Sequence, residues 1–442
     1  WDEEFEESAF DIGYQEYPKR YIIITLYIAA CTVQAFMLFS FVSVTDEAKA
    51  AYGVSDAVVQ LTAVIFLVGT IGTFLPAAYL IQNYGVRFCS ILATALTFVG
   101  AVIRLFQNLG FGLLICSSIV TALGFSLTQI SVVRICADWF KPQHRTQALA
   151  VGSLANPIGT TMAFLIPYLF LSHVSLAEQT ELKHAFQHVH YLQAGLCILC
   201  FLATYFWMED IPPSPPSAST ITIRFDSFSE SLKRLLRSPD YLRILGMIAI
   251  NLSLNQGLSA TLDSILTRGA DFSKNQVCIC AIIMLTAGVV GTLIMARYVD
   301  ENKRFKDPIM ILTAVFCLIS TLQGYVIDSG NIYVIYVSGA IQGFTLLASG
   351  ALLLDLASEV AYPVTEDVSF ALIFTVGQVL AIATTFGFLW MIDERVFKFV
   401  GIAMAIMTLF GMTLFVRLNE TLNRLEADKY NPIAICPDTT FQ

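Results

Sequence analysis

Long apolar runs separated by short polar segments dominate the sequence. Twelve windows of about 20 apolar residues, the length that an α-helix needs to cross a bilayer, can be placed along it. They lie near residues 21–43, 57–81, 88–107, 109–133, 147–171, 190–208, 242–266, 276–298, 308–327, 332–354, 368–391 and 396–416. Because backbone N–H and C=O groups cannot be left open to lipid, the pattern predicts an all-α membrane protein.

A pattern of charged and proline positions occurs twice in the chain, and both Arg positions of the first copy are acids in the second. The first copy is Arg134, Asp138, Pro142 and Arg145, and the second is Asp355, Glu359, Pro363 and Glu366, at the same spacings. An internal repeat of about half the chain, in so apolar a sequence, is typical of a transporter built from two similar halves. The predicted helices therefore form two sets of six.

Polar segments divide the chain. IleProProSerProProSerAlaSer at 211–219 has the composition of an exposed linker, and an amphipathic stretch with Lys233, Arg234 and Arg237 follows it. The predicted boundaries are a tail at 1–20, a first half at 21–209, a linker at 210–240, a second half at 241–418 and a tail at 419–442. Segments on one side of the membrane carry 18 Lys and Arg and those on the other side carry 7, which predicts that both tails and the linker are cytoplasmic.

Composition excludes most other classes of protein. With 56% hydrophobic and only 13% charged residues, the chain is not a set of soluble domains. No basic block indicates a nucleic acid partner. Because the sequence has no Ser, His and Asp constellation, metal-ligand spacing or phosphate loop, we expect no enzyme activity, no cofactor and no bound metal. The first apolar run is longer than 20 residues and follows Lys19 and Arg20, so we expect it to span the membrane rather than to be cleaved.

The loops after the second helix of each half carry related signals. The first loop has Gly85 and Arg87, with Gln82 where an Asp is usual, and the second has Asp300, Lys303, Arg304 and Lys306. Together with the two halves, these loops resemble the major facilitator superfamily. That resemblance implies an all-α membrane fold of twelve transmembrane helices in two pseudo-symmetric six-helix halves, which transports a solute by rocking of the halves about a central site.

A narrower resemblance extends over residues 17–425. It rests on TyrProLysArg at 17–20, TyrGlyVal at 52–54, ArgIle and TrpPhe within 134–140, AsnProIleGly at 156–159, SerAlaThrLeuAspSerIleLeu at 259–266 and GluValAlaTyrProValThrGlu at 359–366. These segments resemble the feline leukaemia virus subgroup C receptor-related family, and the Pro-rich linker and Gly377-Gln378 resemble its orphan major facilitator domain-containing branch. The resemblance implies transport of choline or ethanolamine, of haem, or in one branch of a vitamin such as pyridoxine. A receptor or membrane-complex subunit that keeps the fold without transporting is the alternative from another class.

The resemblance carries the family's substrate site over only in part. Gln378 matches a Gln on helix 11. Pro157 stands at a Gln position of helix 5, Leu38 at a Trp position of helix 1 and Gln256 at a Tyr position of helix 7. The aromatic cage that would hold a quaternary ammonium is therefore missing at its two matching positions.

Two other groups of residues could line the binding site. Phe36, Phe39 and Phe41 could supply a shifted aromatic cage on helix 1, or they could face lipid or the core. Amides at membrane depth face either a cavity or a partner helix, and these are Gln34, Gln129, Asn156, Asn251, Asn255, Gln256 and Gln378. The predicted substrate-binding set is Gln378, Gln256, Asn255, Leu38, Phe39, Gln34 and Asn156.

Charged residues mark the cytoplasmic ends of several helices. The predicted gating residues are Arg134, Asp138, Arg145, Asp355, Glu359 and Glu366. Opposite charges on the two halves can latch this side shut, and pairing within each half is the alternative. We expect no charged residue in the cavity near mid-membrane, and we expect Asp263, toward the outer end of its helix, to matter less than Gln378. A neutral or singly cationic solute is then favoured over a multiply anionic one.

Two further motifs concern other partners. His173, His184, His188 and His190 lie in or beside the loop between helices 5 and 6, where they could hold a metal or haem, sense pH or be solvated. Tyr430 to Ile433 fits a signal for a tail-binding sorting adaptor. The expected partners are thus a small-molecule substrate, the lipid bilayer and such an adaptor. We favour the plasma membrane, with an endolysosomal or other organelle membrane as the alternative.

Overall fold

The computed structural model describes most of the chain. The residues described are 17–41, 44–171, 173–175, 177–214, 216, 227–270, 272–394, 396, 398–418 and 422–429. Within these ranges every regular element is a helix, as the apolar windows predict.

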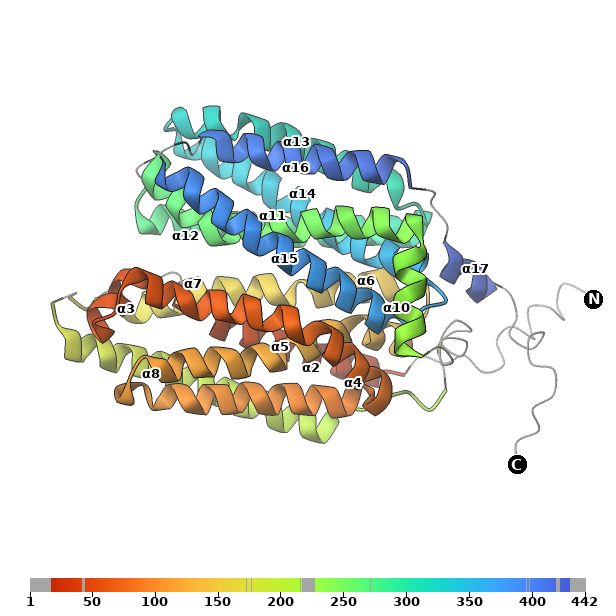
Figure 1. Cartoon of the computed structure of the whole chain (residues 1–442), viewed down its shortest axis with the longest axis horizontal. Coiled ribbons are helices and arrows are strands. Elements are labelled where there is room, and N and C mark those ends of the chain that lie inside the picture. The colour runs from red at the N-terminus through yellow and green to blue at the C-terminus, as the bar shows by residue number, and fades with distance from the viewer. Residues whose placement is uncertain are drawn as a thin grey trace, which may run out of the picture.

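Two helical bundles lie side by side (Figure 1). The first contains α2 (Lys19–Phe39), α3 (Thr45–Tyr52), α4 (Asp56–Leu105), α5 (Gly112–Trp139), α6 (Arg145–Ser153), α7 (Ala155–Leu171) and α8 (Gln179–Trp207), with a short 3-10 turn at Gln107–Leu109. The second contains α11 (Pro239–Ala270), α12 (Lys274–Asn302), α13 (Lys306–Asp328), α14 (Ile332–Ala361), α15 (Glu366–Asp393) and α16 (Lys398–Val416). The short helices α10 (Phe228–Arg237) and α17 (Asn423–Lys429) precede and follow this second bundle along the chain.

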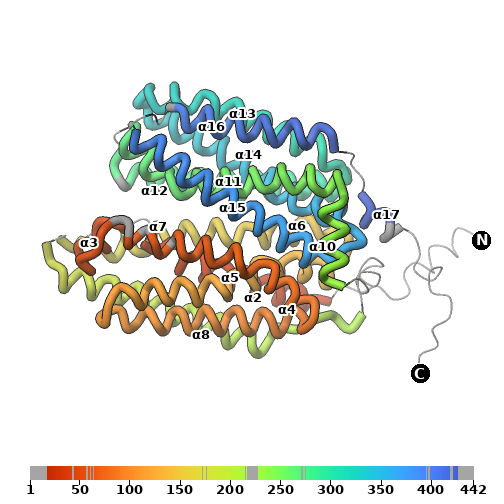
Figure 2. The backbone as a smooth tube through the Cα atoms, in the orientation of Figure 1, coloured from red at the N-terminus to blue at the C-terminus, as the bar shows by residue number. Residues whose placement is uncertain are grey.

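The twelve predicted spans account for these helices. Ten helices among the described residues are long and apolar enough to cross a membrane. The 50-residue α4 supplies two spans, because Gly85 has a φ of 81° and a ψ of 168° that interrupt the helix. α6 and α7 together supply one span. α11 is not among the ten because its apolar run is broken by polar residues, yet it is 32 residues long and runs alongside the others (Figure 2).

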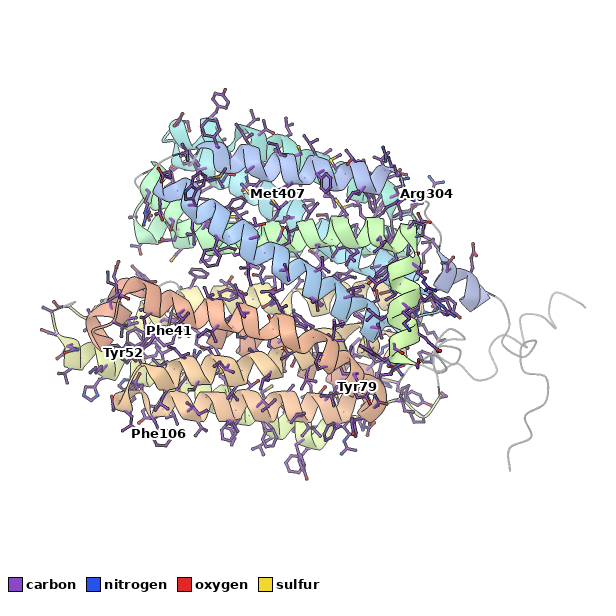
Figure 3. All side chains as sticks on the ribbon, in the orientation of Figure 1. Phe41, Tyr52, Tyr79, Phe106, Arg304 and Met407 are labelled. Atoms are coloured by element: carbon purple, nitrogen blue, oxygen red, sulfur yellow. The ribbon has the colours of Figure 1, made fainter. Side chains whose placement is uncertain are left out.

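Short helices distinguish the two ends of the bundles. α10 and α17 lie at one end, which we call the α10 end, and α3 lies at the other, which we call the α3 end (Figure 1). Tyr79 and Arg304 lie toward the α10 end, whereas Tyr52 and Phe106 lie toward the α3 end (Figure 3). Exposed apolar side chains cover the outside of the bundles, as a surface in contact with lipid requires.

Close helix contacts within each half depend on glycines. A Cβ on Gly159 of α7 would lie 2.2 Å from the Thr32 carbonyl oxygen of α2. A Cβ on Gly343 of α14 would lie 2.1 Å from the Met284 carbonyl oxygen of α12. Small residues at such crossings let membrane helices approach closely, so each half packs as a unit.

The helix α8 begins earlier than the predicted window, which starts near residue 190. α8 starts at Gln179, so His184 and His188 lie on a helix rather than in a loop. Leu182, Phe186 and Val189 are buried at helical spacing, and this apolar stripe extends the helix beyond the membrane-spanning window.

Candidate functional site: a cavity between the two halves

A cavity of about 250 Å³ lies between the two halves. Its walls come from α2, α4, α5, α6 and α7 of the first half and from α11, α12, α14 and α15 of the second. Tyr168, Asp263 and Val277 line its part nearest the α3 end. A cavity at the interface of two repeats is where transporters of this architecture bind a solute.

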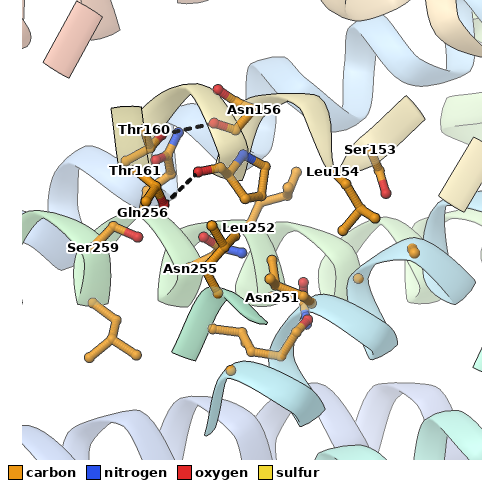
Figure 4. A pocket seen from close by; sticks show the side chains of 18 of the residues that line it. Ser153, Leu154, Asn156, Thr160, Thr161, Asn251, Leu252, Asn255, Gln256 and Ser259 are labelled. Atoms are coloured by element: carbon orange, nitrogen blue, oxygen red, sulfur yellow. Dashed lines mark hydrogen bonds between the residues drawn. The ribbon is translucent and has the colours of Figure 1, made fainter. Parts of the chain in front are cut away.

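Polar side chains of α7 and α11 face each other across the cavity. Asn156, Thr160 and Thr161 come from α7, and Asn255, Gln256, Ser259 and Asp263 come from α11. The α11 residues recur at intervals of three and four, which places them on one helix face. Figure 4 shows Asn156, Thr160 and Thr161 of α7 with Asn255, Gln256 and Ser259 of α11. Amides and hydroxyls provide both donors and acceptors, so this wall can orient a polar group of a bound solute.

Aromatic rings form another wall. Phe74 of α4 and Phe374 of α15 stack across the two halves with ring centroids 5.4 Å apart and planes at 25°. Phe370 contacts Phe374 edge to face at 6.1 Å. All three line the cavity, together with Tyr27 and Phe125. Aromatic faces attract cations as well as apolar groups.

Asp263 is the one acidic or basic side chain that lines this cavity in the part of the chain that the structure describes. It lies on the polar face of α11, toward the α3 end. No Lys or Arg lines the cavity among the described residues. The sequence places Asp263 toward the outer end of its helix, and the cavity extends to that position.

Four residues of the predicted substrate-binding set line the cavity. They are Asn156, Asn255, Gln256 and Gln378, which come from α7, α11 and α15. Gln129 and Asn251 combine both roles that polar residues can have at membrane depth. Gln129 lines the cavity, and its side-chain oxygen accepts from the Cys31 thiol of α2 at 3.1 Å. Asn251 lines the cavity and donates to the Leu346 carbonyl oxygen at 3.3 Å, so it also holds α11 to α14.

The remaining three residues of that set do not reach the cavity. Gln34 is buried within the first half and donates to the hydroxyls of Thr97 and Thr128 at 2.9 and 3.0 Å. Leu38 and Phe39 are buried in the core of the same half. The expectation fails because this part of α2 faces α4, α5 and α8, and only Tyr27 of α2 lines the cavity.

The three Phe of helix 1 do not form the shifted cage, and they follow the alternative interpretation, in which such rings pack in the core. Phe36 is fully buried in the core of the first half. Phe41 stacks on Phe186 at a centroid distance of 5.7 Å near the α3 end. The aromatic rings of the cavity come from other helices instead, and nothing in the sequence distinguishes them from the rest of the 33 Phe.

Charged residues connect the two halves at the α10 end. The guanidinium of Arg134 on α5 lies 2.7 Å from Asp138 and 3.5 Å from Asp367 on α15. The second of these pairs crosses between the halves. The predicted latch thus has a cross-half ion pair, but the partner of Arg134 is Asp367, which the repeat did not indicate. Pairing within a half, the alternative, is also present in the bond to Asp138.

A second set of cross-half contacts lies beside this pair. The backbone N–H of Gln147 on α6 donates to Asp300 of α12 at 3.2 Å. The ammonium of Lys303, which follows α12, donates to the Pro142 carbonyl oxygen at 3.3 Å. Both contacts join the segment around α6 to the last turn of α12 and the residue that follows it, so the α10 end is closed in this structure.

The other predicted gating residues gather around the C-terminal helix α17. Arg424 of α17 is 1% exposed and pairs with Glu366 at 2.8 Å. The backbone N–H of Leu425 donates to Glu359 at 2.9 Å. A small cavity nearby is lined by Arg145 and Asp355, among others. The sequence offered no signal that a tail residue would neutralise these acids.

The histidines and the tail motif remain outside the site. His184 and His188 are exposed on α8, and the Nδ1 atom of His188 lies 2.7 Å from the His184 carbonyl oxygen. The described residues include no group of three or more His, Cys, Asp and Glu that could hold a metal ion. The sorting motif at Tyr430 lies outside the described residues.

Comparisons with known proteins agree with this geometry. The family described as Major Facilitator Superfamily matches residues 25–385. The human choline/ethanolamine transporter FLVCR2 is 22% identical over 430 residues, covering 93% of this chain and 79% of the relative. The mouse choline/ethanolamine transporter FLVCR1 is 23% identical over 400 residues, covering 83% and 69%. Solute carrier family 49 member A3 of Xenopus tropicalis is 24% identical over 384 residues, covering 84% and 77%.

Solved structures show the same fold. The Escherichia coli fucose:proton symporter FucP superposes with a TM-score of 0.71 at 12% identity, covering 91% of this chain and 100% of that one. The proton:xylose symporter XylE superposes with a TM-score of 0.70 at 14% identity, covering 93% and 99%. The predicted fold class and the resemblance to the feline leukaemia virus subgroup C receptor-related proteins are confirmed.

Proposed function

The chain belongs to the Major Facilitator Superfamily and is a multi-pass solute transporter of the membrane, and on that premise we propose that its substrate is a small organic amine of the choline and ethanolamine class. The observation that carries the proposal is the lining of the central cavity. Asp263 supplies a negative charge, Phe74, Phe370 and Phe374 supply aromatic faces, and the lining has no Lys or Arg among the described residues.

The physical argument concerns the cost of removing a cation from water. An ammonium group that enters a narrow cavity loses hydration, and it needs a carboxylate or aromatic faces in return. A cation over an aromatic ring gains about 0.5 to 2 kcal/mol. Gln378 and Gln256 can bond the hydroxyl of choline or ethanolamine, because an amide both donates and accepts. These features support an amine over a solute that is merely polar.

The same lining argues against haem, the alternative substrate within the family. Two propionates would meet Asp263 with no basic side chain among the described lining residues. The only His or Cys among those residues is Cys278. A neutral ring such as pyridoxine could use the amide wall, but it would gain little from Asp263.

Alternating access follows from the contacts at the two ends. Ion pairs and hydrogen bonds join the halves at the α10 end, while the cavity extends toward the α3 end. At the α3 end, the Tyr168 hydroxyl of α7 donates to the side-chain oxygen of Asn275 on α12. Contacts thus join the halves at both ends in this structure, and we infer that rocking of the halves breaks the contacts of one end while those of the other hold. The cytoplasmic location of the α10 end, and residence in the plasma membrane rather than an organelle, remain predictions from the sequence.

Uptake into proteoliposomes tests the proposal. The purified chain should take up labelled choline or ethanolamine, and Asp263→Asn should weaken binding by about tenfold or more, in line with the loss of one desolvated charge pair. Gln378→Ala should weaken it less, since a neutral hydrogen bond is worth about 1 kcal/mol. Glu181→Gln, which removes an exposed acid on α8 outside the cavity, is the matched control.

Two outcomes would contradict the proposal. If neither the parent chain nor Asp263→Asn takes up choline or ethanolamine while pyridoxine uptake depends on Gln378, the substrate is neutral. If no labelled solute enters and a thermal-shift screen finds no stabilising amine, vitamin or haem, the chain acts as a receptor or complex subunit with a transporter fold.

A further inference from the structure

The short helix α10 lies across the ends of the membrane-spanning helices. It runs nearly at right angles to them at the α10 end of the bundles (Figure 1). Its ten residues end at Arg237, and after Ser238 the chain turns directly into α11. A helix in this orientation lies parallel to the membrane plane, at the level where the spans leave the lipid.

One face of α10 packs against the protein. Ser231 and Leu235, four residues apart, are buried, and Phe228 and Leu232 pack against the core. The ring of Phe228 meets the ring of Tyr79 on α4 edge to face, with centroids 5.9 Å apart. The rest of the helix contacts α11 and α15. α10 therefore touches both halves of the transporter.

The opposite face is basic and partly apolar. Lys233, Arg234 and Arg237 are exposed, and Glu230 is the one acid within the helix. Leu236, between the basic residues, is 48% exposed. Tyr79, beneath the start of the helix, is 52% exposed on the outer surface of α4. Basic residues interspersed with apolar ones on the open face of a helix parallel to the membrane are typical of helices that lie in the headgroup layer.

We propose that this face of α10 binds anionic phospholipid headgroups. Three basic side chains against one acid complement a negatively charged lipid surface, and Leu236 can enter the acyl boundary beside them. The Lys and Arg count predicts that the α10 end is cytoplasmic, and the cytoplasmic leaflet is the one that carries anionic lipids. Because α10 contacts both halves, bound lipid stabilises the state in which the α10 end is closed.

A binding titration on the full purified chain in neutral detergent tests this proposal. Soluble short-chain phosphatidylserine is added, with short-chain phosphatidylcholine and inorganic phosphate as separate arms, and binding is followed by thermal shift. Phosphatidylserine should bind, and added salt should weaken it. Lys233→Gln with Arg237→Gln should weaken it about thirtyfold, the change that corresponds to about 1 kcal/mol for each basic residue near an anionic surface.

The matched control removes two charges from the same end of the molecule but away from α10. Arg297→Gln with Arg304→Gln changes exposed residues of α12 and the loop after it, and it should leave phosphatidylserine binding unchanged. Equal loss in both double variants would overturn the proposal, because attraction to the whole end would then be the cause. Equal binding of phosphatidylcholine, or displacement of phosphatidylserine by inorganic phosphate, would also overturn it. Thermal midpoints without lipid show that each variant is folded.

Discussion

The ion pair between Arg134 and Asp367 controls, in our interpretation, how readily the α10 end opens. Asp367 is fully buried, and its oxygens have no hydrogen-bond partner among the described residues, so the guanidinium 3.5 Å away is its compensation. At an effective dielectric constant of about 20, two charges at that distance attract by about 4 to 5 kcal/mol. Desolvation offsets roughly half of this attraction, which leaves about 2 kcal/mol.

The substitution Asp367→Asn removes this attraction at nearly constant volume. A loss of about 2 kcal/mol in the closed state should raise the ratio of open to closed molecules about 30-fold. Spin labels on exposed sites of the two halves at the α10 end, Tyr84 of α4 and Arg304 after α12, with reactive native cysteines replaced, report that ratio as a shift to longer distances. Solute uptake measured in parallel shows whether cycling is impaired.

A matched control and a charge exchange make the experiment decisive. Glu301→Gln breaks an exposed pair with Arg297 within α12, and a pair of that kind is worth about 0 to 1 kcal/mol, so the distances should not change. Exchange of the charges, Arg134→Asp with Asp367→Arg, should recover part of the closed population. An unchanged distance distribution in Asp367→Asn, or strictly additive effects in the exchange, would refute the cross-half latch.

Three further predictions concern other parts of the molecule. Gln34→Leu should lower the thermal midpoint, because it removes two buried hydrogen bonds, to the hydroxyls of Thr97 and Thr128, each worth about 1 kcal/mol, but it should leave amine affinity unchanged in binding titrations. Phe74→Leu keeps an apolar side chain yet removes the ring that stacks across the halves, so choline affinity should fall several-fold while binding of an uncharged analogue stays the same. Arg424→Gln leaves Glu366 buried without this ion pair. It should lower the free energy of unfolding by about 3 to 5 kcal/mol, measured by thermal unfolding. Glu426→Gln, on the exposed side of α17, is the control and should leave that free energy unchanged.

The membrane fold could be predicted from the sequence because its physical requirement is simple. A span must be apolar for about 20 residues, and this requirement locates the helices whatever their contacts are. The break at Gly85 could also be predicted, since a glycine in a polar loop can adopt a φ of 81°. The start of α8 could not be predicted. Outside the membrane window its buried apolar residues are few, and the polar residues between them favour a loop over a helix.

The lining of the cavity could be predicted only in part, because an amide at membrane depth can face either the cavity or a neighbouring helix. Gln378 and Gln256 line it as expected, whereas Gln34 satisfies the same need through hydroxyls of its own half. Composition cannot separate these solutions, since both remove an amide from lipid. The latch shows the same limit at finer scale, because consecutive residues of a helix point about 100° apart. Glu366 matches the repeat, but its neighbour Asp367 is the one that meets Arg134.

The position of Arg424 has a consequence for how the protein is made. The carboxylates of Glu359 and Glu366 belong to helices that enter the membrane before α17 has been synthesised. Until α17 emerges from the ribosome, the chain has two helical halves but lacks the cation that pairs with Glu366 at the α10 end of the second. Assembly of the α10 end is therefore a late step in biogenesis, and a premature stop just before α17 produces a protein with every span in place that cellular quality control can still recognise as unfinished.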